Sequence, residues 1–120
     1  MIYFSSSYVY ENLDLTKTVN ENNSISPLHN FGLAKSFFEK LILNVHPNTV
    51  IFRLSSVFGR GRGNYLNPNA IEIMVKECIT NKKLTVWGSG SRKMQYVLLQ
   101  DVIKYIFEAP LIDPGIYNIG

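Results

Sequence analysis

Short β-rich runs alternate along the chain with amphipathic stretches. The first run, "IYFS" at residues 2–5, predicts a buried strand that ends in a serine cluster. Residues 11–27 are polar and predict a long surface loop. Apolar residues then recur at three- and four-residue steps over residues 29–45, which predicts a helix that Pro47 ends. The apolar positions of this helix are Phe31, Ala34, Phe38, Leu41, Ile42 and Val45.

The rest of the chain repeats this alternation. Residues 49–54 are apolar at nearly every position, as in a parallel strand covered on both faces. A loop rich in Gly, Asn and Pro precedes a helix over 70–81, and a short strand is expected at 84–87. "MQYVLL" is a further extended piece, Asp101 is expected to cap a helix over 102–109, and "GIYNIG" reads as a last strand. The order β-α-β-α-β-β-α-β predicts an α/β architecture.

Two features predict that this architecture is incomplete. The chain opens directly with a strand of buried type and ends directly after another. A buried strand needs a neighbour on each side, and the chain encodes too few strands to supply them. We therefore expect an incomplete doubly wound sheet.

Composition excludes several classes. With 120 residues, 46% hydrophobic and 18% charged, the chain suits one soluble globular domain, and it has no apolar run of membrane length. Its first residues do not read as a signal peptide, so none is expected. Its single cysteine, Cys78, fits the cytoplasm and is expected to be a buried small hydrophobe. A net charge of +3, spread along the chain, does not favour nucleic acid. The local clusters suit a small anionic ligand: Arg60 with Arg62, and Arg92 with Lys93.

Five motifs occur in a fixed order: "YFSSSYVYE", "FGLAK", "VIFRLSSVFGRG", "LTVWGSGSRKMQYVLLQDV" and "GIYNIG". In this order they resemble the extended short-chain dehydrogenase/reductase family, the NAD(P)-dependent epimerases, dehydratases and reductases of nucleotide sugars. The resemblance implies an incomplete Rossmann-like domain over residues 1–58. It implies part of a small substrate-binding region, with a returning strand, over residues 59–120.

The resemblance also implies catalytic positions. The family has a serine four residues before the tyrosine of its "VYG" motif and then Tyr-x-x-x-Lys, which fall on Ser6, Phe31 and Lys35. Phe31 lies 25 residues after Ser6, as the family spacing requires. The family's tyrosine is the base for hydride transfer, its lysine lowers the tyrosine pKa and reaches the nicotinamide ribose, and its serine orients the substrate.

Phe31 cannot titrate, so the catalytic set has no base at this position. Tyr8, Tyr10 or His29 are possible substitutes, and the spacing does not choose among them. The alternative interpretation is that Phe31 packs on the apolar face of its helix.

The resemblance extends less directly to binding residues. Ser56 falls where the family often has an asparagine near the nicotinamide and the substrate. Arg92 lies two residues before the position of the family's diphosphate-binding arginine, here Met94, and its planar fork suits phosphates. Arg60 and Arg62 are expected in the same pocket or, alternatively, on a solvated surface. No metal site is expected.

The cofactor loop of the family is missing. No G-x-x-G-x-x-G turn occurs in the chain, so the resemblance implies NAD or NADP without the segment that would hold it or distinguish the two. We expect a cytoplasmic fragment resembling a nucleotide-sugar epimerase, dehydratase or reductase, inactive alone. Two alternatives are a non-catalytic nucleotide-sugar binding module, and a subunit completed by a separate N-terminal chain or working as a homodimer.

Overall fold

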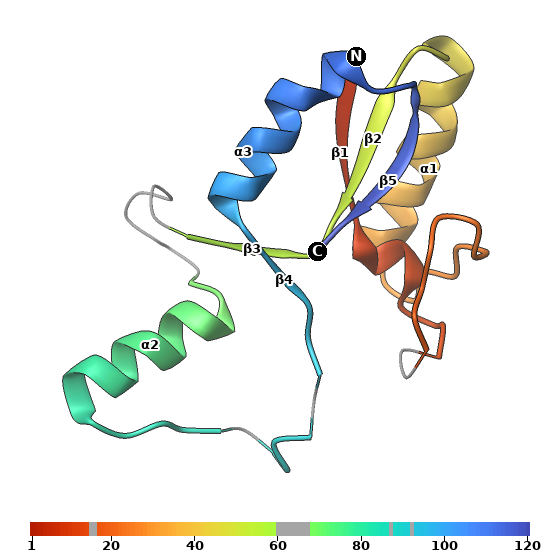
Figure 1. The fold of residues 1–120 in the computed structure, drawn as a ribbon. Helices are drawn as coiled ribbons and strands as arrows, with labels where there is room; N and C mark the ends of the chain where they lie inside the picture. Colours follow the sequence, from red (N-terminus) through yellow and green to blue (C-terminus); the bar gives the residue numbers. More distant parts are fainter. Residues whose placement is uncertain (15–16, 60–67, 87, 92) are drawn as a thin grey trace.

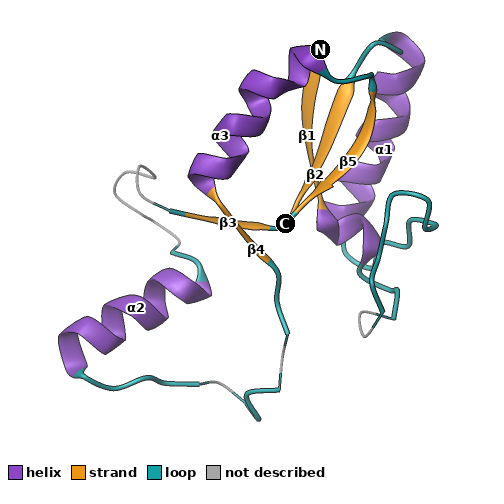
Figure 2. Ribbon diagram, viewed as in Figure 1, coloured by secondary structure: helices purple, strands orange, loops and turns teal. Residues whose placement is uncertain are grey.

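The computed structural model describes residues 1–14, 17–59, 68–86, 88–91 and 93–120. Its elements alternate between strand and helix, with parallel sheets, so the α/β prediction is confirmed (Figures 1 and 2). The strands are β1 (Ile2–Ser6), β2 (Val50–Leu54), β3 (Ser56–Phe58), β4 (Tyr96–Leu98) and β5 (Gly115–Ile119). The helices are α1 (Asn30–Val45), α2 (Ala70–Asn81) and α3 (Leu99–Glu108), with 3-10 turns η1 (Ser7–Tyr10) and η2 (Ala109–Leu111).

A three-stranded parallel sheet, in the order β1-β2-β5, forms the centre of the described structure. Helices lie on both of its faces, α1 on one and α3 on the other (Figure 1). The core is on the α3 face, where Val50 and Phe52 of β2 pack with Val102 and Ala109. Burial on both faces explains why β2 reads as an almost continuous apolar run.

A smaller parallel pair, β3 with β4, follows the central sheet (Figure 2). β3 begins two residues after β2 ends, and the sequence pattern predicted a strand over 49–54 but none over 56–58. Helix α2 begins after Asn69, whose side chain accepts from Glu72 N while Glu72 accepts from Asn69 N. This capping box fixes the start of the helix where the sequence predicted it.

Helix α1 does not pack on the sheet through the apolar positions of its repeat. Phe31, Phe38 and Val45 are all about half exposed. The buried residues are Gly32, Ser36 and Glu39. The small and polar side of α1 therefore faces the sheet, because the sheet presents Ser5 and Arg53 to it.

Three local predictions are also wrong. Residues 84–86 were expected in a strand and have none, while Trp87 lies outside the described residues. Cys78 was expected to be buried and is exposed on α2, a helix with no buried residue. Asp101 was expected at a helix cap, but α3 begins at Leu99 and Asp101 lies in its first turn, where a carboxylate still favours the helix dipole.

Candidate functional site

An open cleft of about 780 Å³ lies near the carboxyl ends of the central strands. This is the edge where parallel α/β sheets bind ligands. The cleft draws on η1, the loop after it, the ends of β2 and β5, and the segment before β4. Its polar lining residues include Tyr8, Tyr10, Glu11, Lys17, His29, Ser55, Ser56, Lys93, Gln95 and Asn118.

Ser6 ends β1 and begins η1. Its hydroxyl accepts a hydrogen bond from Tyr8 N at 3.3 Å, which caps the 3-10 turn. The residue is buried and does not line the cleft. In this structure Ser6 therefore sets the position of Tyr8.

Phe31 stands at the first turn of α1, half exposed, and meets Tyr8 edge-on. The two ring centroids are 5.6 Å apart and the ring planes differ by 88°. Gly32 makes this approach possible, since a Cβ there would lie 2.5 Å from Tyr8 O and 2.9 Å from Pro27 Cβ. The glycine of "FGLAK" is thus required for α1 to reach η1.

Lys35 lies one turn further along α1, and its ammonium group is already bonded. Nζ donates to Phe4 O at 2.7 Å and lies 5.2 Å from the Tyr3 ring centroid and 5.7 Å from that of Phe31. Tyr3, Phe31, Ala34, Lys35 and Phe38 line a second hollow, of about 310 Å³. Tyr8 is thus the residue that contacts Phe31 and also lines the larger cleft.

Phe4 O faces away from the neighbouring strand. Met1 O accepts from Val50 N in β2 at 2.9 Å, and carbonyl groups alternate in direction along a strand. The carbonyl of Phe4, three residues later, therefore points to the free edge of β1, where Lys35 binds it.

Of the predicted substrate-binding residues, Ser56 lies in the cleft, at the start of β3, with Ser55 beside it. The Ser55 hydroxyl is buried and has no hydrogen-bond partner among the described residues. Arg60, Arg62 and Arg92 lie outside the described residues. Lys93, which adjoins the last of them, lines the cleft.

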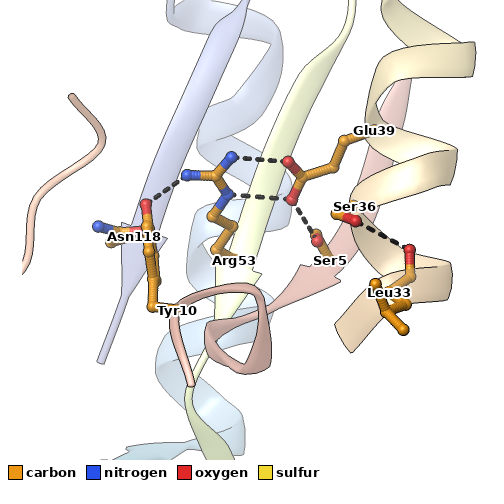
Figure 3. Close-up of polar contacts among 7 residues, drawn as sticks. All are labelled: Ser5, Tyr10, Leu33, Ser36, Glu39, Arg53 and Asn118. Carbon is orange, nitrogen blue, oxygen red and sulfur yellow. Dashed lines mark hydrogen bonds and ion pairs between the residues drawn. The ribbon is translucent and has the colours of Figure 1, made fainter. Parts of the chain in front are cut away.

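A buried polar network, which the motifs did not indicate, joins β1, β2, β5, α1 and η1 (Figure 3). Arg53 Nη2 donates to Glu39 Oε2 at 2.6 Å and Arg53 Nε donates to Glu39 Oε1 at 3.0 Å. Ser5 Oγ also donates to Glu39, and Arg53 donates to the Tyr10 hydroxyl. That hydroxyl donates to Asn118 Oδ1 at 3.2 Å.

Charge compensation by Glu39 sets the direction of the pKa shift of Arg53. Burial by itself would lower the pKa of Arg53, but the hydrogen bonds and negative charge of Glu39 raise it above its usual value. Burial, and then the charge of Glu39, raise the pKa of Tyr3. The one signal in the sequence was Arg53 inside an apolar strand, because a charge buried there requires a partner.

Glu11 organises the start of α1 from the preceding loop. Its carboxylate accepts from Leu28 N at 3.2 Å and from His29 N at 3.1 Å, and it bonds His29 Nδ1 at 2.9 Å. Desolvation raises the pKa of Glu11, but these hydrogen bonds outweigh it and bring the pKa below its usual value. The N-cap residue His29 makes no side-chain cap of its own, so Glu11 supplies it.

The described part of the chain contains neither a metal-ligand cluster nor a membrane-spanning helix. No cluster of three or more His, Cys, Asp or Glu side chains there is placed to hold a metal ion. No helix among the same residues is long and apolar enough to cross a membrane.

Two proteins of Bacillus subtilis are similar to this chain in sequence. The spore coat polysaccharide biosynthesis protein SpsK of Bacillus subtilis is 30% identical over 99% of this chain. The uncharacterized UDP-glucose epimerase YtcB of the same organism is 31% identical over 88% of it. The chain spans only 39% and 33% of the lengths of these two relatives.

Solved structures of two nucleotide-sugar enzymes are also similar to this chain. A tyrosine-to-phenylalanine mutant of UDP-glucuronic acid 4-epimerase from Bacillus cereus, in complex with a UDP-sugar and NAD, matches 99% of this chain with a TM-score of 0.79 and 28% identity. dTDP-glucose 4,6-dehydratase from Bacillus anthracis matches with a TM-score of 0.80 at 22% identity, which supports the fold alone. This chain covers 39% of each. The family described as NAD dependent epimerase/dehydratase matches residues 1–120, and the chain belongs to that family.

Proposed function

We propose that this chain supplies the residues that bind the nucleotide sugar in an epimerase/dehydratase site. We also propose that it does not carry out hydride transfer by itself. The observation that carries the proposal is the cleft at the carboxyl edge of the sheet. It places Ser56, Lys93 and Gln95 around an open volume, while Phe31 occupies the position of the family's base. Hydroxyl, ammonium and amide groups of this kind bind the hydroxyls and phosphates of a sugar nucleotide.

The residues present do not fit a whole dinucleotide cofactor. The sequence has no Gly-rich turn to surround the pyrophosphate. Lys35, which the family resemblance assigns to the nicotinamide ribose, bonds Phe4 O instead. We therefore propose that NAD or NADP is not bound by this chain alone, and no reaction step is derived through it.

One solved neighbour combines a tyrosine-to-phenylalanine exchange with bound ligands. The Bacillus cereus epimerase with this exchange is in complex with both a UDP-sugar and NAD. By analogy, we propose that Phe31 does not prevent this chain from binding a sugar nucleotide. A missing general base costs roughly 10²- to 10⁴-fold in rate.

Isothermal titration of the chain with UDP- and GDP-sugars tests the proposal. Saturable heat with one of these ligands supports it, and loss of that heat in a Lys93→Ala variant places the ligand in the cleft. Lys104→Ala is the matched control, since Lys104 is an exposed lysine on α3 away from the cleft. The absence of heat with every sugar nucleotide contradicts the proposal.

A second candidate is a subunit completed by another chain that carries the first strands of the fold. The outer edge of β1 favours it, because no strand among the described residues pairs with that edge, and such an edge accepts a further strand. The exposed aromatic face of α1 adds apolar surface beside that edge. The upstream reading frame decides this candidate: if no Gly-rich βαβ segment is encoded nearby, the candidate fails.

A further inference from the structure

Three candidate substitutes for the base that is missing at Phe31 carry groups able to exchange a hydrogen bond or a proton with a sugar hydroxyl: Tyr8, Tyr10 and His29. All three line the cleft. The sequence did not choose among them, but their surroundings in the structure differ.

Tyr10 is already committed to the buried network. Its side chain is almost fully buried, and its hydroxyl accepts from Arg53 and donates to Asn118. A ligand would have to break one of these bonds to use the hydroxyl. Tyr10 therefore has a structural role, and its hydroxyl is occupied by protein partners.

His29 is held through only one of its two ring nitrogens, and its side chain is 74% exposed. Its Nδ1 bonds Glu11 Oε1, and its backbone N–H bonds the other carboxylate oxygen of Glu11. These contacts belong to the start of α1.

Tyr8 differs from both. The residue is 41% exposed, and its backbone N–H and carbonyl have partners in Ser6 and Glu11. Among the described residues none is a hydrogen-bond partner of its hydroxyl. Its ring is fixed edge-on against Phe31, so the phenol is held beside the position where the family's own phenol would stand.

We infer that Tyr8 contacts the sugar of the bound nucleotide in the cleft. Its hydroxyl forms a hydrogen bond with the sugar, which Phe31 cannot form because it has no hydroxyl. The inference rests on the proposed function, because it assumes that the cleft binds a nucleotide sugar. It adds that the ligand is a sugar with a free ring hydroxyl. The aromatic contact with Phe31 and the bond from Tyr8 N to Ser6 orient the phenol.

The test compares UDP-glucose with UDP on the full chain by isothermal titration, in wild type, Tyr8→Phe and Tyr105→Phe. Tyr8→Phe is expected to weaken UDP-glucose binding about fivefold to tenfold, the loss of one hydrogen bond, and to leave UDP binding unchanged. Tyr105 is a matched control, since it is 37% exposed on α3 and does not line the cleft. Unchanged UDP binding also shows that the variant is folded.

Each other outcome overturns the inference. If Tyr8→Phe and wild type bind UDP-glucose with equal affinity, the Tyr8 hydroxyl forms no hydrogen bond with the sugar. Equal weakening of UDP and UDP-glucose shows a structural role. Wild-type affinity no higher for UDP-glucose than for UDP shows that no sugar contact exists. If wild type binds neither ligand, the proposed function fails together with the inference, and this result is read separately from the variants.

Discussion

Replacing Glu39 by glutamine tests how the buried network holds α1 to the sheet. Arg53 and Glu39 have side chains only 4% and 3% exposed and share two hydrogen bonds. The substitution leaves the Arg53 charge buried and uncompensated, which costs about 3–5 kcal/mol. Since a domain is stable by only about 5–15 kcal/mol, this is a large share of the free energy of unfolding.

Urea unfolding followed by circular dichroism measures this loss. The control is Glu108→Gln, which breaks the exposed Lys104–Glu108 pair at 3.9 Å and is expected to cost about 0.3–0.5 kcal/mol. A Glu39→Leu/Arg53→Met double variant is expected to be more stable than Glu39→Gln, because it removes both charges together. The reasoning is refuted if Glu39→Gln costs no more than the surface control, or if the double variant is the less stable.

Three further predictions concern local contacts that fix the helices and the loop before α1. Gly32→Ala is expected to destabilise the chain by about 1–3 kcal/mol in the same assay, because a Cβ would lie 2.5 Å from Tyr8 O; stabilisation, as at an ordinary helical glycine, would contradict this contact. The lowered pKa of Glu11 gives a stabilisation present above its usual value of 4.5 and lost as the pH falls through the lowered value. Glu11→Gln should remove that part of the acid dependence of unfolding, and an unchanged pH profile would be contrary evidence. Asn69→Ala is expected to cost about 1 kcal/mol and to lower the helical circular dichroism signal, and no change in either would show that the capping box is dispensable.

The positions of most elements could be predicted from local pattern. α2 begins and ends at the predicted residues because Asn69 and Glu72 form its capping box within the sequence itself. Apolar runs gave β1, β2 and β5 to within about one residue, because a parallel strand covered on both faces is apolar throughout.

The orientation of α1 could not be predicted, because it depends on a partner distant in sequence. Periodicity chose the face with Phe31 and Phe38, yet the sheet presents polar groups and takes the face with Glu39. Arg53 lies 14 residues from Glu39, on another element, and no local rule pairs them. The same holds for Glu11, which reaches the start of α1 across a loop.

Part of the candidate site was predicted from motif spacing and part was not. Spacing located Phe31, Lys35 and Ser56, and the structure puts Phe31 and Lys35 beside one hollow and Ser56 in the larger cleft. Spacing did not indicate that Lys35 bonds Phe4 O, because that contact depends on the free edge of β1. The roles of these residues in binding stay predictions.

We propose above all that this chain carries the residues that bind the sugar nucleotide and lacks those that bind the cofactor. Titrating NADH with the isolated chain, and following nicotinamide fluorescence, tests this claim most directly. The absence of a Gly-rich turn and the bond between Lys35 and Phe4 O predict no saturable change in fluorescence at micromolar chain concentrations. Saturable micromolar binding of NADH would contradict the account.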